Sequence, residues 1–406
     1  MSAAAPVPDL APLDDAWLRD PAAQRVAAAL LEGGAQALFV GGCVRNALLS
    51  RFGAPAPVAD VDLATDARPE RTVELLTRAG LRAVPTGIAH GTVTAVADGR
   101  PFEITTFRAD LRGHGRHAEV AFGADLAQDA ARRDFTMNAL YARPDGAVLD
   151  PVGGLPDLRA RRVRFIGDAG RRIREDYLRI LRFFRFHAWY GANGIDPEGL
   201  AACAEGLDGL DRLSRERIGH EMRRLLAAPD PAPALAAMAA CGALARVLPG
   251  ADPALIAPLT HVEALAGAAP DWLRRLAALA PGADADELAR ALRLSNAERR
   301  RLAAAAAARE AAEPPARAAW RHGPDAARDA ALIDAAARAA PPPADLEAEL
   351  ARGAGARMPV RARDLAARGV APGPQMGAEL RRLEKAWLDS DMRLDAEALL
   401  ARVGKG

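Results

Sequence analysis

Strand signals in this sequence are confined to roughly its first 165 residues, and this uneven distribution limits the folds that the chain can adopt. A run with β-branched residues covers 58–65, and two such runs flank Asp98-Gly99 within 91–108, which is typical of a β-hairpin. The remaining chain keeps helical spacing of Leu and Arg in alanine-rich segments, which are interrupted by prolines such as those at 341–343. The pattern predicts a small α+β head followed by a long all-α region.

Short ranges of the head are each typical of one kind of element. Glycine follows both of its first two helical patterns, as expected where helices end. The expected elements are a helix at 15–34, strands at 37–40 and 58–65, a helix at 68–80, the hairpin at 91–108, a polar loop at 109–118, a helix at about 124–140 and a second hairpin turn at Asp145-Gly146.

Composition narrows the class of protein. With 406 residues the chain has room for several domains, and a net charge of +1 gives no global basic field, so any nucleic-acid contact must come from local patches. The three cysteines are widely spaced and fit a reducing cytoplasm. The N-terminus lacks the pattern of a signal peptide, and the longest apolar run, 302–308, is too short to span a membrane. We therefore expect a soluble, cytoplasmic protein without membrane partners.

Three acidic residues stand on the predicted strands of the head. Asp60 and Asp62 are two apart, so alternation along a strand would place both carboxylates on one face. Glu103 interrupts an apolar, β-branched run, where a charge is costly unless it faces a cleft or a partner. Carboxylate oxygens suit Mg²⁺, and the three together suggest a two-metal phosphoryl-transfer site. An Asp-x-Asp pair alone is also common on a solvated strand face.

A glycine pair joins the strand at 37–40 to the next helix. Gly41 and Gly42 would let backbone N–H groups approach an anion at the helix N-terminus, and Arg45 adds a cation one turn later. A tight strand–helix turn is the equally simple reading. The segment is neither GxGxxG nor a Walker A loop, which excludes the Rossmann and P-loop readings.

Two further segments combine charge with apolar surroundings. In RRDFTMNAL (132–140), Asp134 and Asn138 are spaced to share a helix face beside Arg133, which would suit a sugar hydroxyl. An N-cap and a surface arginine pair is the alternative there. EDYLRILRFFRF (175–186) threads Asp176 and three arginines through the most aromatic part of the chain. Ten arginines between 159 and 185 face only three acids in that range, which favours triphosphate and RNA backbone over a solvated charged face.

Six motifs in one order over residues 36–225 resemble a known family. They are GGCVRNALL, VADVDLATD, RRDFTMNAL, DPVGGLPDL, EDYLRILRFFRF and LSRERIGHE. This order resembles the class II tRNA nucleotidyltransferases, which are the CCA-adding enzymes, and their relatives the bacterial poly(A) polymerases. A weaker likeness to the tail of the same family covers 361–387, whereas 226–355 shows none.

The resemblance implies roles for the matching positions. Asp60 and Asp62 would bind Mg²⁺, and Glu103 is similar to a third acidic residue of the head. Arg133 would lie at the ribose with Asp134 beside it. The implied nucleotide-binding residues are Gly42, Arg45, Arg133, Asp134, Asp176, Arg179, Arg182 and Arg185, the last two towards the triphosphate.

Asp176 and Arg179 can account for base selection in physical terms. CTP and ATP both present an amino group beside a ring nitrogen acceptor, so a carboxylate and an arginine three residues apart on a helix could pair with them. GTP and UTP present a carbonyl and a ring N–H there, and groups left unpaired cost about 1–3 kcal/mol each. A surface ion pair is the alternative for an isolated EDxxR.

Two positions differ from the usual residues of the family, and one loop resembles a family feature. The family usually has Asp where this chain has Asn46, which can orient Arg45 but cannot form an ion pair with it, and often Pro or Ala where Tyr177 stands. The loop 108–118 resembles the flexible loop needed for adding the terminal A, and its residues Arg108, Asp110 and Arg116 argue against a CC-only enzyme.

The resemblance implies a polymerase β-like, mixed-sheet nucleotidyltransferase head on an all-α neck, body and tail. The expected segments are an N-terminal tail with the start of the first helix (1–23), the catalytic head (24–150), a neck that recognises the base (151–225), a helical body (226–345) and a helical, tRNA-binding tail (346–406). The expected activity is addition of CCA to the tRNA 3′ end from CTP and ATP. A poly(A) polymerase is the alternative that no single residue excludes, and a non-catalytic nucleotide- or RNA-binding protein is a remote one.

Overall fold

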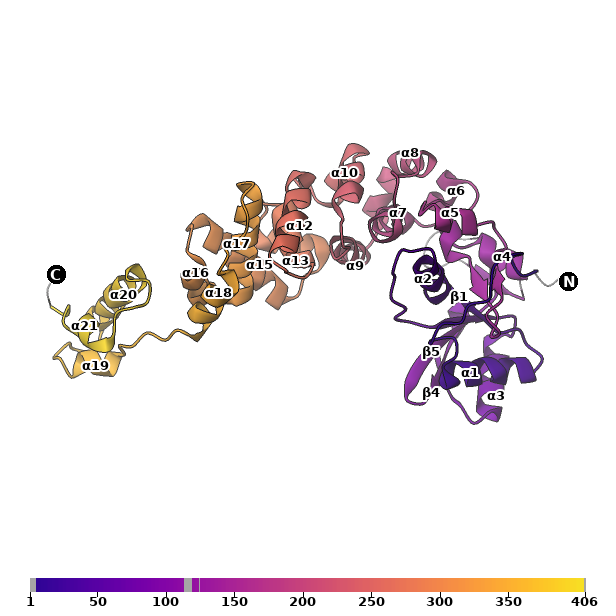
Figure 1. Cartoon of the computed structure of the whole chain (residues 1–406), viewed down its shortest axis with the longest axis horizontal. Coiled ribbons are helices and arrows are strands. Elements are labelled where there is room, and N and C mark those ends of the chain that lie inside the picture. Colours follow the sequence, from indigo (N-terminus) through magenta and orange to yellow (C-terminus); the bar gives the residue numbers. More distant parts are fainter. Residues whose placement is uncertain (1–4, 113–118, 124, 405–406) are drawn as a thin grey trace. The chain divides into compact units, whose positions relative to one another are not determined.

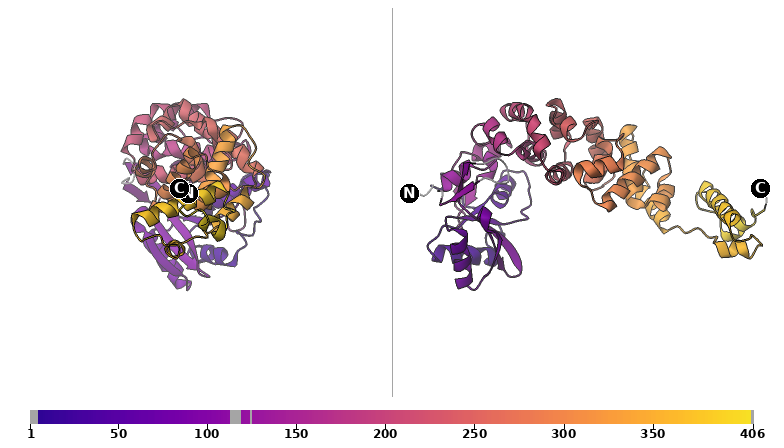
Figure 2. Two further views of the ribbon diagram at one scale, coloured as in Figure 1. Left: turned by 90° about the vertical axis from the view of Figure 1, so that its left-hand side faces the viewer. Right: turned by 180° about the vertical axis from the view of Figure 1, so that it is seen from behind.

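The computed structural model describes residues 5–112, 119–123 and 125–404. The chain divides into two compact units, residues 1–249 and 250–406. Within the described residues every strand lies in the first unit, between residues 38 and 149, and the second unit is helical (Figures 1 and 2). This confirms the α+β fold class and the confinement of strands to the first 165 residues.

A seven-stranded mixed sheet forms the head, in the order β3-β4-β5-β2-β1-β8-β9. Strands β2 and β5 run parallel, and the other neighbours are antiparallel. A separate hairpin is formed by β6 and β7. The strands are β1 Leu38–Val40, β2 Asp62–Thr65, β3 Arg82–Gly87, β4 Thr92–Ala97, β5 Arg100–Thr106, β6 Arg108–Arg112, β7 Glu119–Phe122, β8 Tyr141–Ala142 and β9 Val148–Leu149.

Both predicted hairpin turns occur, but several strand boundaries differ from the expectation. Asp98 and Gly99 have φ of 51° and 74°, as a two-residue hairpin turn requires. Strand β2 begins only at Asp62, so Asp60 lies in the preceding loop and not on the strand as expected. The edge strand β3 was missed because its sequence, RAVPTG, is polar and holds a proline. The first residues of the expected loop at 109–118 belong to strand β6, and strand β7 begins directly after that range.

Helices α1 (Pro21–Glu32) and α3 (Pro69–Arg78) pack on each other and on strand β4. The expected helix at 15–34 starts six residues later because Asp20 caps it, its side chain accepting from the N–H of Ala22, and Pro21 takes the first helical position. Together with α2 (Gly42–Arg51), these helices are the long helices of the head.

The helix expected at 124–140 is wrong in its second half. Helix α4 covers only Leu126–Ala131, and 136–138 forms a single 3₁₀ turn. Between them Phe135 bridges to Phe165 as in a sheet, and the N–H of Thr136 donates to the carbonyl of Arg164 at 3.0 Å. Pairing with a segment 30 residues away therefore overrides the local helical preference.

The neck helices pack against this pairing. The ring of Phe135 lies 4.9 Å from that of Phe165 and 5.0 Å from that of Phe186, so EDYLRILRFFRF packs against this part of the head. The helices that complete the first unit are α5 Leu155–Arg159, α6 Ala169–Glu175, α7 Leu178–Tyr190, α8 Pro197–Glu205, α9 Arg215–Leu226, α10 Ala232–Ala240 and α11 Ala243–Val247.

The second unit is a succession of helices. Its C-terminal cluster includes Leu383, Trp387 and Leu399, and the ring of Trp387 meets that of Trp320 edge-on at 5.4 Å. No helix among the described residues has the length and apolarity needed to cross a membrane. The helices are α12 Ile256–Leu265, α13 Trp272–Leu279, α14 Ala285–Leu292, α15 Asn296–Glu310, α16 Pro315–His322, α17 Pro324–Ala337, α18 Leu346–Gly355, α19 Ala362–Ala366, α20 Pro374–Asp389 and α21 Ala396–Leu400.

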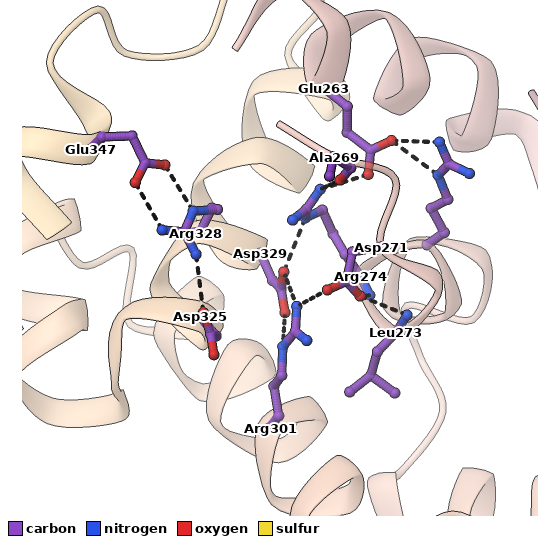
Figure 3. Close-up of polar contacts among 11 residues, drawn as sticks. Glu263, Ala269, Asp271, Leu273, Arg274, Arg301, Asp325, Arg328, Asp329 and Glu347 are labelled. Carbon is purple, nitrogen blue, oxygen red and sulfur yellow. Dashed lines mark hydrogen bonds and ion pairs between the residues drawn. The ribbon is translucent and has the colours of Figure 1, made fainter. Parts of the chain in front are cut away.

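Buried ion pairs join four helices of this unit (Figure 3). Asp329 on α17 accepts from Arg274 on α13 at 3.0 Å and from Arg301 on α15 at 2.8 Å, although it is only 2% exposed. Arg274 also donates to Glu263 on α12 at 2.7 Å, and Arg301 to Asp271 at 2.6 Å. Each carboxylate thus compensates a guanidinium that would be very costly to bury alone.

We expect Asp329→Ala to lower the free energy of unfolding of the second unit by about 3–5 kcal/mol, because the buried guanidinium of Arg274 and the half-buried one of Arg301 lose their shared carboxylate. Asp325→Ala on the same helix is the matched control, since Asp325 pairs with Arg328 at an exposed site, and its cost should stay below about 1 kcal/mol. Urea unfolding followed by circular dichroism measures both, and equal losses would contradict this account of the network.

Candidate active site

The turn between β1 and α2 has the form that the glycine pair predicts. Gly41 caps the helix with a φ of 73°, where a side chain would strain the backbone, and Gly42 is the first helical residue. A Cβ built on Gly42 would lie 3.8 Å from Nη2 of Arg45, and one built on Gly41 would lie 3.9 Å from Nη1 of Arg133. Two of the predicted arginines therefore stand beside the N-terminus of α2.

The three predicted carboxylates line one open pocket of about 470 Å³. Leu63 pairs with Ile104 across the parallel strands β2 and β5, so Asp62 and Glu103 are neighbours at the edge of the sheet, and Asp60 joins them from the loop. Burial, followed by the negative charges of Glu103 and Asp60, raises the pKa of Asp62 to about 6. Arg133 lowers the pKa of Asp62, so its guanidinium lies near this carboxylate.

A hard divalent cation fits this set of donors. Oxygen ligands and clustered negative charge are what such ions require, and Mg²⁺ is usually held by one or two carboxylates together with phosphate oxygens and water. Among the described residues no three acidic, histidine or cysteine side chains converge on one metal position. Asp60 and Asp62 are therefore candidate ligands, and Glu103 is better placed as a neighbour that modifies their charge than as a third ligand.

Arg45 is held by neutral groups. It is 6% exposed, and Oδ1 of Asn46 accepts from both its Nε and its Nη2, at 3.0 and 2.9 Å. Oδ1 of Asn138 accepts at 2.6 Å, and the hydroxyl of Tyr190 accepts at 2.8 Å. Burial lowers the pKa of this guanidinium. The expectation that Asn46 orients Arg45 is confirmed.

Arg133 is fixed by two residues that sequence reasoning missed. Its Nε donates to the hydroxyl of Tyr141 at 2.9 Å, and its Nη2 lies 3.1 Å from the carboxylate of Asp129. That tyrosine hydroxyl in turn donates to Asp129 at 2.8 Å. Burial would lower the pKa of Arg133, but Tyr141 and Asp129 outweigh it and raise the pKa. The sequence signal that could have identified Asp129 is its position one helical turn before Arg133.

Asp134 connects the head to the neck. Asn138 donates to its Oδ1 at 2.9 Å, as their spacing predicted, although a 3₁₀ turn and not an α-helix brings them together. Arg182 of α7 donates to its Oδ2 at 2.8 Å. Burial would raise the pKa of this carboxyl, but Arg182 and the hydrogen bonds overcome that effect and hold the pKa well below its usual range.

The segment EDYLRILRFFRF is not one helix, which corrects the expected side-by-side placement of Asp176 and Arg179. Asp176 is extended, with φ of −153°, at the end of α6, and α7 begins at Leu178. The Asp176 carboxylate pairs with Arg217 of α9 at 2.6 Å, whereas Arg179 pairs with Glu175 at 2.7 Å. Arg217, within LSRERIGHE, is a third residue that sequence reasoning missed.

The end of the arginine series differs from its expected place at the triphosphate. Arg185 is 3% exposed, and its Nε donates to Glu221 of α9 at 2.5 Å. Counting only neighbours in sequence also overestimated the positive charge of 159–185, because eight of its ten arginines form ion pairs. Acids from distant segments, including Asp134, Asp196 and Glu221, provide half of these pairs.

The flexible loop of the resemblance corresponds to the β6–β7 hairpin. Arg108 opens β6, and its Nη1 donates to the carbonyl of His90. A Cβ on Gly91 would come within 2.7 Å of the Phe122 ring, so the base of the hairpin packs tightly on this turn. Asp110 falls within the backbone of β6, while its side chain and the whole of Arg116 lie outside the described residues.

Comparison with known proteins agrees with this architecture. Residues 37–164 match the poly A polymerase head domain, and 194–255 match the family described as the probable RNA and SrmB-binding site of polymerase A. The chain thus carries a nucleotidyltransferase head of the poly(A) polymerase type followed by its RNA-binding region. The resemblance to tRNA nucleotidyltransferases and poly(A) polymerases is thereby confirmed.

Individual relatives are CCA-adding enzymes. The chain is 43% identical over 194 residues to human mitochondrial CCA tRNA nucleotidyltransferase 1, covering 46% of this chain and 43% of that protein. It is 40% identical over 220 residues to the CCA-adding enzyme of Geobacillus thermodenitrificans, covering 53% and 52%. These matches span about half the length of the curated relatives.

Solved structures match over nearly the whole chain. The CCA-adding enzyme of Bacillus stearothermophilus in complex with CTP has a TM-score of 0.74 and 29% identity, covering 94% of this chain and 98% of that one. The Thermotoga maritima enzyme complexed with tRNA_CCA has a TM-score of 0.69 and 17% identity, covering 97% and 96%. The second likeness concerns the fold alone.

The raised pKa of Asp62 predicts a pH-dependent stability. A carboxyl with a pKa of about 6 in the fold and an ordinary pKa of 3.8 binds its proton more tightly when folded, so the free energy of unfolding falls as pH rises from 4 to 6. Asp62→Asn should remove this loss and stabilise the first unit at pH 7.5 by about 1–2 kcal/mol, allowing for partial solvent exposure.

The measurement is thermal unfolding in EDTA at pH 7.5 and at pH 4, where variant and parent should converge. Asp14→Asn is a suitable control, because Asp14 forms an exposed ion pair with Arg19. A variant that is no more stable than the parent at pH 7.5 would show that the fold does not disfavour the charged form of Asp62.

Proposed function

We propose that this protein is a CCA-adding tRNA nucleotidyltransferase, which extends the tRNA 3′ end from CTP and ATP without a nucleic-acid template. The observation that carries the proposal is the 29% identity with the CTP-bound Bacillus stearothermophilus enzyme over 98% of that chain. The acidic pocket beside Arg133 and the N-terminus of α2 supplies the matching chemistry. We further propose a cytoplasmic location, which suits three cysteines that are all free.

The reaction is a displacement at the α-phosphorus. The 3′-hydroxyl oxygen of the RNA forms a bond to this phosphorus, the bond to the β-phosphate oxygen breaks, and pyrophosphate leaves with that electron pair. Mg²⁺ held by Asp60 and Asp62 would supply Lewis-acid stabilisation of the phosphate charge. The hydroxyl proton passes to a base, for which the exposed carboxylate of Glu103 is the candidate.

The arginines and the glycine turn orient the nucleotide. The backbone N–H groups at Gly42 and the start of α2 favour an anion, and Arg45 and Arg133 add fixed cations next to them. Arg182, held by Asp134, continues this positive surface into the neck. Arg185 is closed off by Glu221, so we assign it a positioning role and not a contact with the triphosphate.

Base selection is assigned to Asp176 and Arg179, as the resemblance implies. Oδ1 of Asp176 accepts from the N–H of Leu178 at 3.1 Å, and Oδ2 pairs with Arg217. A carboxylate offers about four acceptor positions, so it can hold these partners and still accept from the amino group of cytosine or adenine. Arg217 fixes the orientation that this recognition requires.

Incubation of a tRNA that ends before CCA with Mg²⁺, CTP and ATP should give addition of three nucleotides. Asp60→Ala should reduce incorporation by at least about 100-fold, the scale of losing one stabiliser of transition-state charge. Asp66→Ala, just beyond the same strand, should leave incorporation near the parent rate, because Asp66 bonds only to Gln36 among the described residues. Product lengths on a sequencing gel give all three results.

Long tails of A from ATP alone would establish the poly(A) polymerase alternative and overturn the proposal. Unchanged incorporation by Asp60→Ala would remove the metal assignment. Binding of nucleotide without any incorporation by the parent protein would favour the non-catalytic alternative.

Asp176→Ala should relax the exclusion of UTP and GTP by about 10- to 100-fold. The carbonyl group of the wrong base then no longer faces a carboxylate, so one of its two mismatches is removed. The ratio of kcat/KM for CTP and UTP on the same primer measures this selectivity. Asp208→Ala, a partner of Arg246 at the surface, serves as the control. Unchanged selectivity in Asp176→Ala would show that the base is read elsewhere.

A further inference from the structure

Arg45 has an unusual set of partners for a buried guanidinium. Within the described residues its hydrogen-bond acceptors are two asparagine amides and one tyrosine hydroxyl, all of them neutral. These contacts use four of the five N–H groups of the side chain, which leaves one on Nη1 for an incoming group. A buried cation without a directly bonded carboxylate keeps its attraction for an anion, but its position depends entirely on these neutral acceptors.

Asn46 both accepts and donates hydrogen bonds at this site. Its Oδ1 accepts from Arg45 twice, while its Nδ2 donates to the carbonyl of Pro57 at 2.6 Å. Pro57 belongs to the loop that leads to Asp60 and Asp62. A carboxylate at this position could pair with Arg45 but could not donate to Pro57, so the amide links the arginine to the acidic loop without neutralising it.

Tyr190 supplies the remaining contact from the neck. It is the last residue of α7, and its hydroxyl accepts from Nη2 of Arg45 at 2.8 Å. The guanidinium carbon also lies 3.9 Å from the centre of its ring, within the range of a cation–π contact. The ring itself packs on Phe186 one turn earlier, with centroids 5.5 Å apart. Tyr190 is thereby fixed to the helix that carries Arg182.

We infer that Tyr190 is a positioning residue for nucleotide binding, which holds Arg45 in place from the neck helix. Tyr190 and Asn46 together provide the acceptors that an ion-pairing carboxylate would otherwise provide. The inference rests on the proposed function, since Arg45 is assigned to the nucleotide there. It assigns the hydroxyl of Tyr190 a role beyond packing, because the ring alone would leave Nη2 without this acceptor.

The test uses Tyr190→Phe in the full-length protein, which keeps the ring and removes the hydroxyl. The Kd for CTP in Mg²⁺ is measured by calorimetry without RNA, and KM and kcat are measured by incorporation. We expect the Kd and KM for CTP and ATP to rise about three- to tenfold, the worth of one hydrogen bond, with kcat changed less than twofold. Trp189→Phe is the matched control on the same helix, since it removes a hydrogen bond to the carbonyl of Arg224 and should leave Kd unchanged.

A rescue variant separates positioning from a general loss of packing. Asn46→Asp, added to Tyr190→Phe, places a stronger acceptor against the guanidinium but loses the donation to Pro57, so it should recover part of the lost affinity. Equal Kd values for Tyr190→Phe and the parent, or a loss that Asn46→Asp does not recover at all, would overturn this inference. Absence of incorporation by the parent protein would overturn the proposed function instead.

Discussion

The carboxylate of Asp134 is the interaction on which the geometry of the first unit depends. It is 8% exposed and accepts from Arg182 of the neck and from Asn138 of the head, and Asn138 in turn holds Arg45. Removal of this carboxylate would take from the half-buried Arg182 its hydrogen-bonded acid and from Asn138 its acceptor. The same residue therefore secures the head against α7 and sets the positions of two arginines that face the proposed nucleotide.

Around this centre, ion pairs and hydrogen bonds fix the charged side chains of the candidate site. Asp129 and Tyr141 fix Arg133, Glu221 fixes Arg185, and Arg217 fixes Asp176. The acidic pocket is the exception, because its three carboxylates repel one another and only Arg133 opposes them. A site that is destabilised by its own charge and open to solvent is suited to binding a cation together with a polyphosphate.

The second unit applies the same principle. Glu263, Arg274, Arg301 and Asp329 connect four helices, of which α15 and α17 bury mostly alanine. Small side chains allow close packing but specify few unique contacts, so buried ion pairs with fixed geometry can define which helices are neighbours. The sequence of this region predicted helices from periodicity alone and gave no indication of which charged residues would be buried.

Local sequence determined the elements whose causes are local. The Asp98-Gly99 turn, the glycine pair before α2 and the alternating strands of the head follow from short-range sterics, and the order of six motifs identified the residues of the candidate site. Tertiary structure alone decided the break at Asp176, the extended segment at Phe135 and the long-range ion pairs, such as those of Arg182 with Asp134 and of Arg217 with Asp176. These features depend on segments 30 or more residues away, whose competition with local helix propensity cannot be read from either segment by itself.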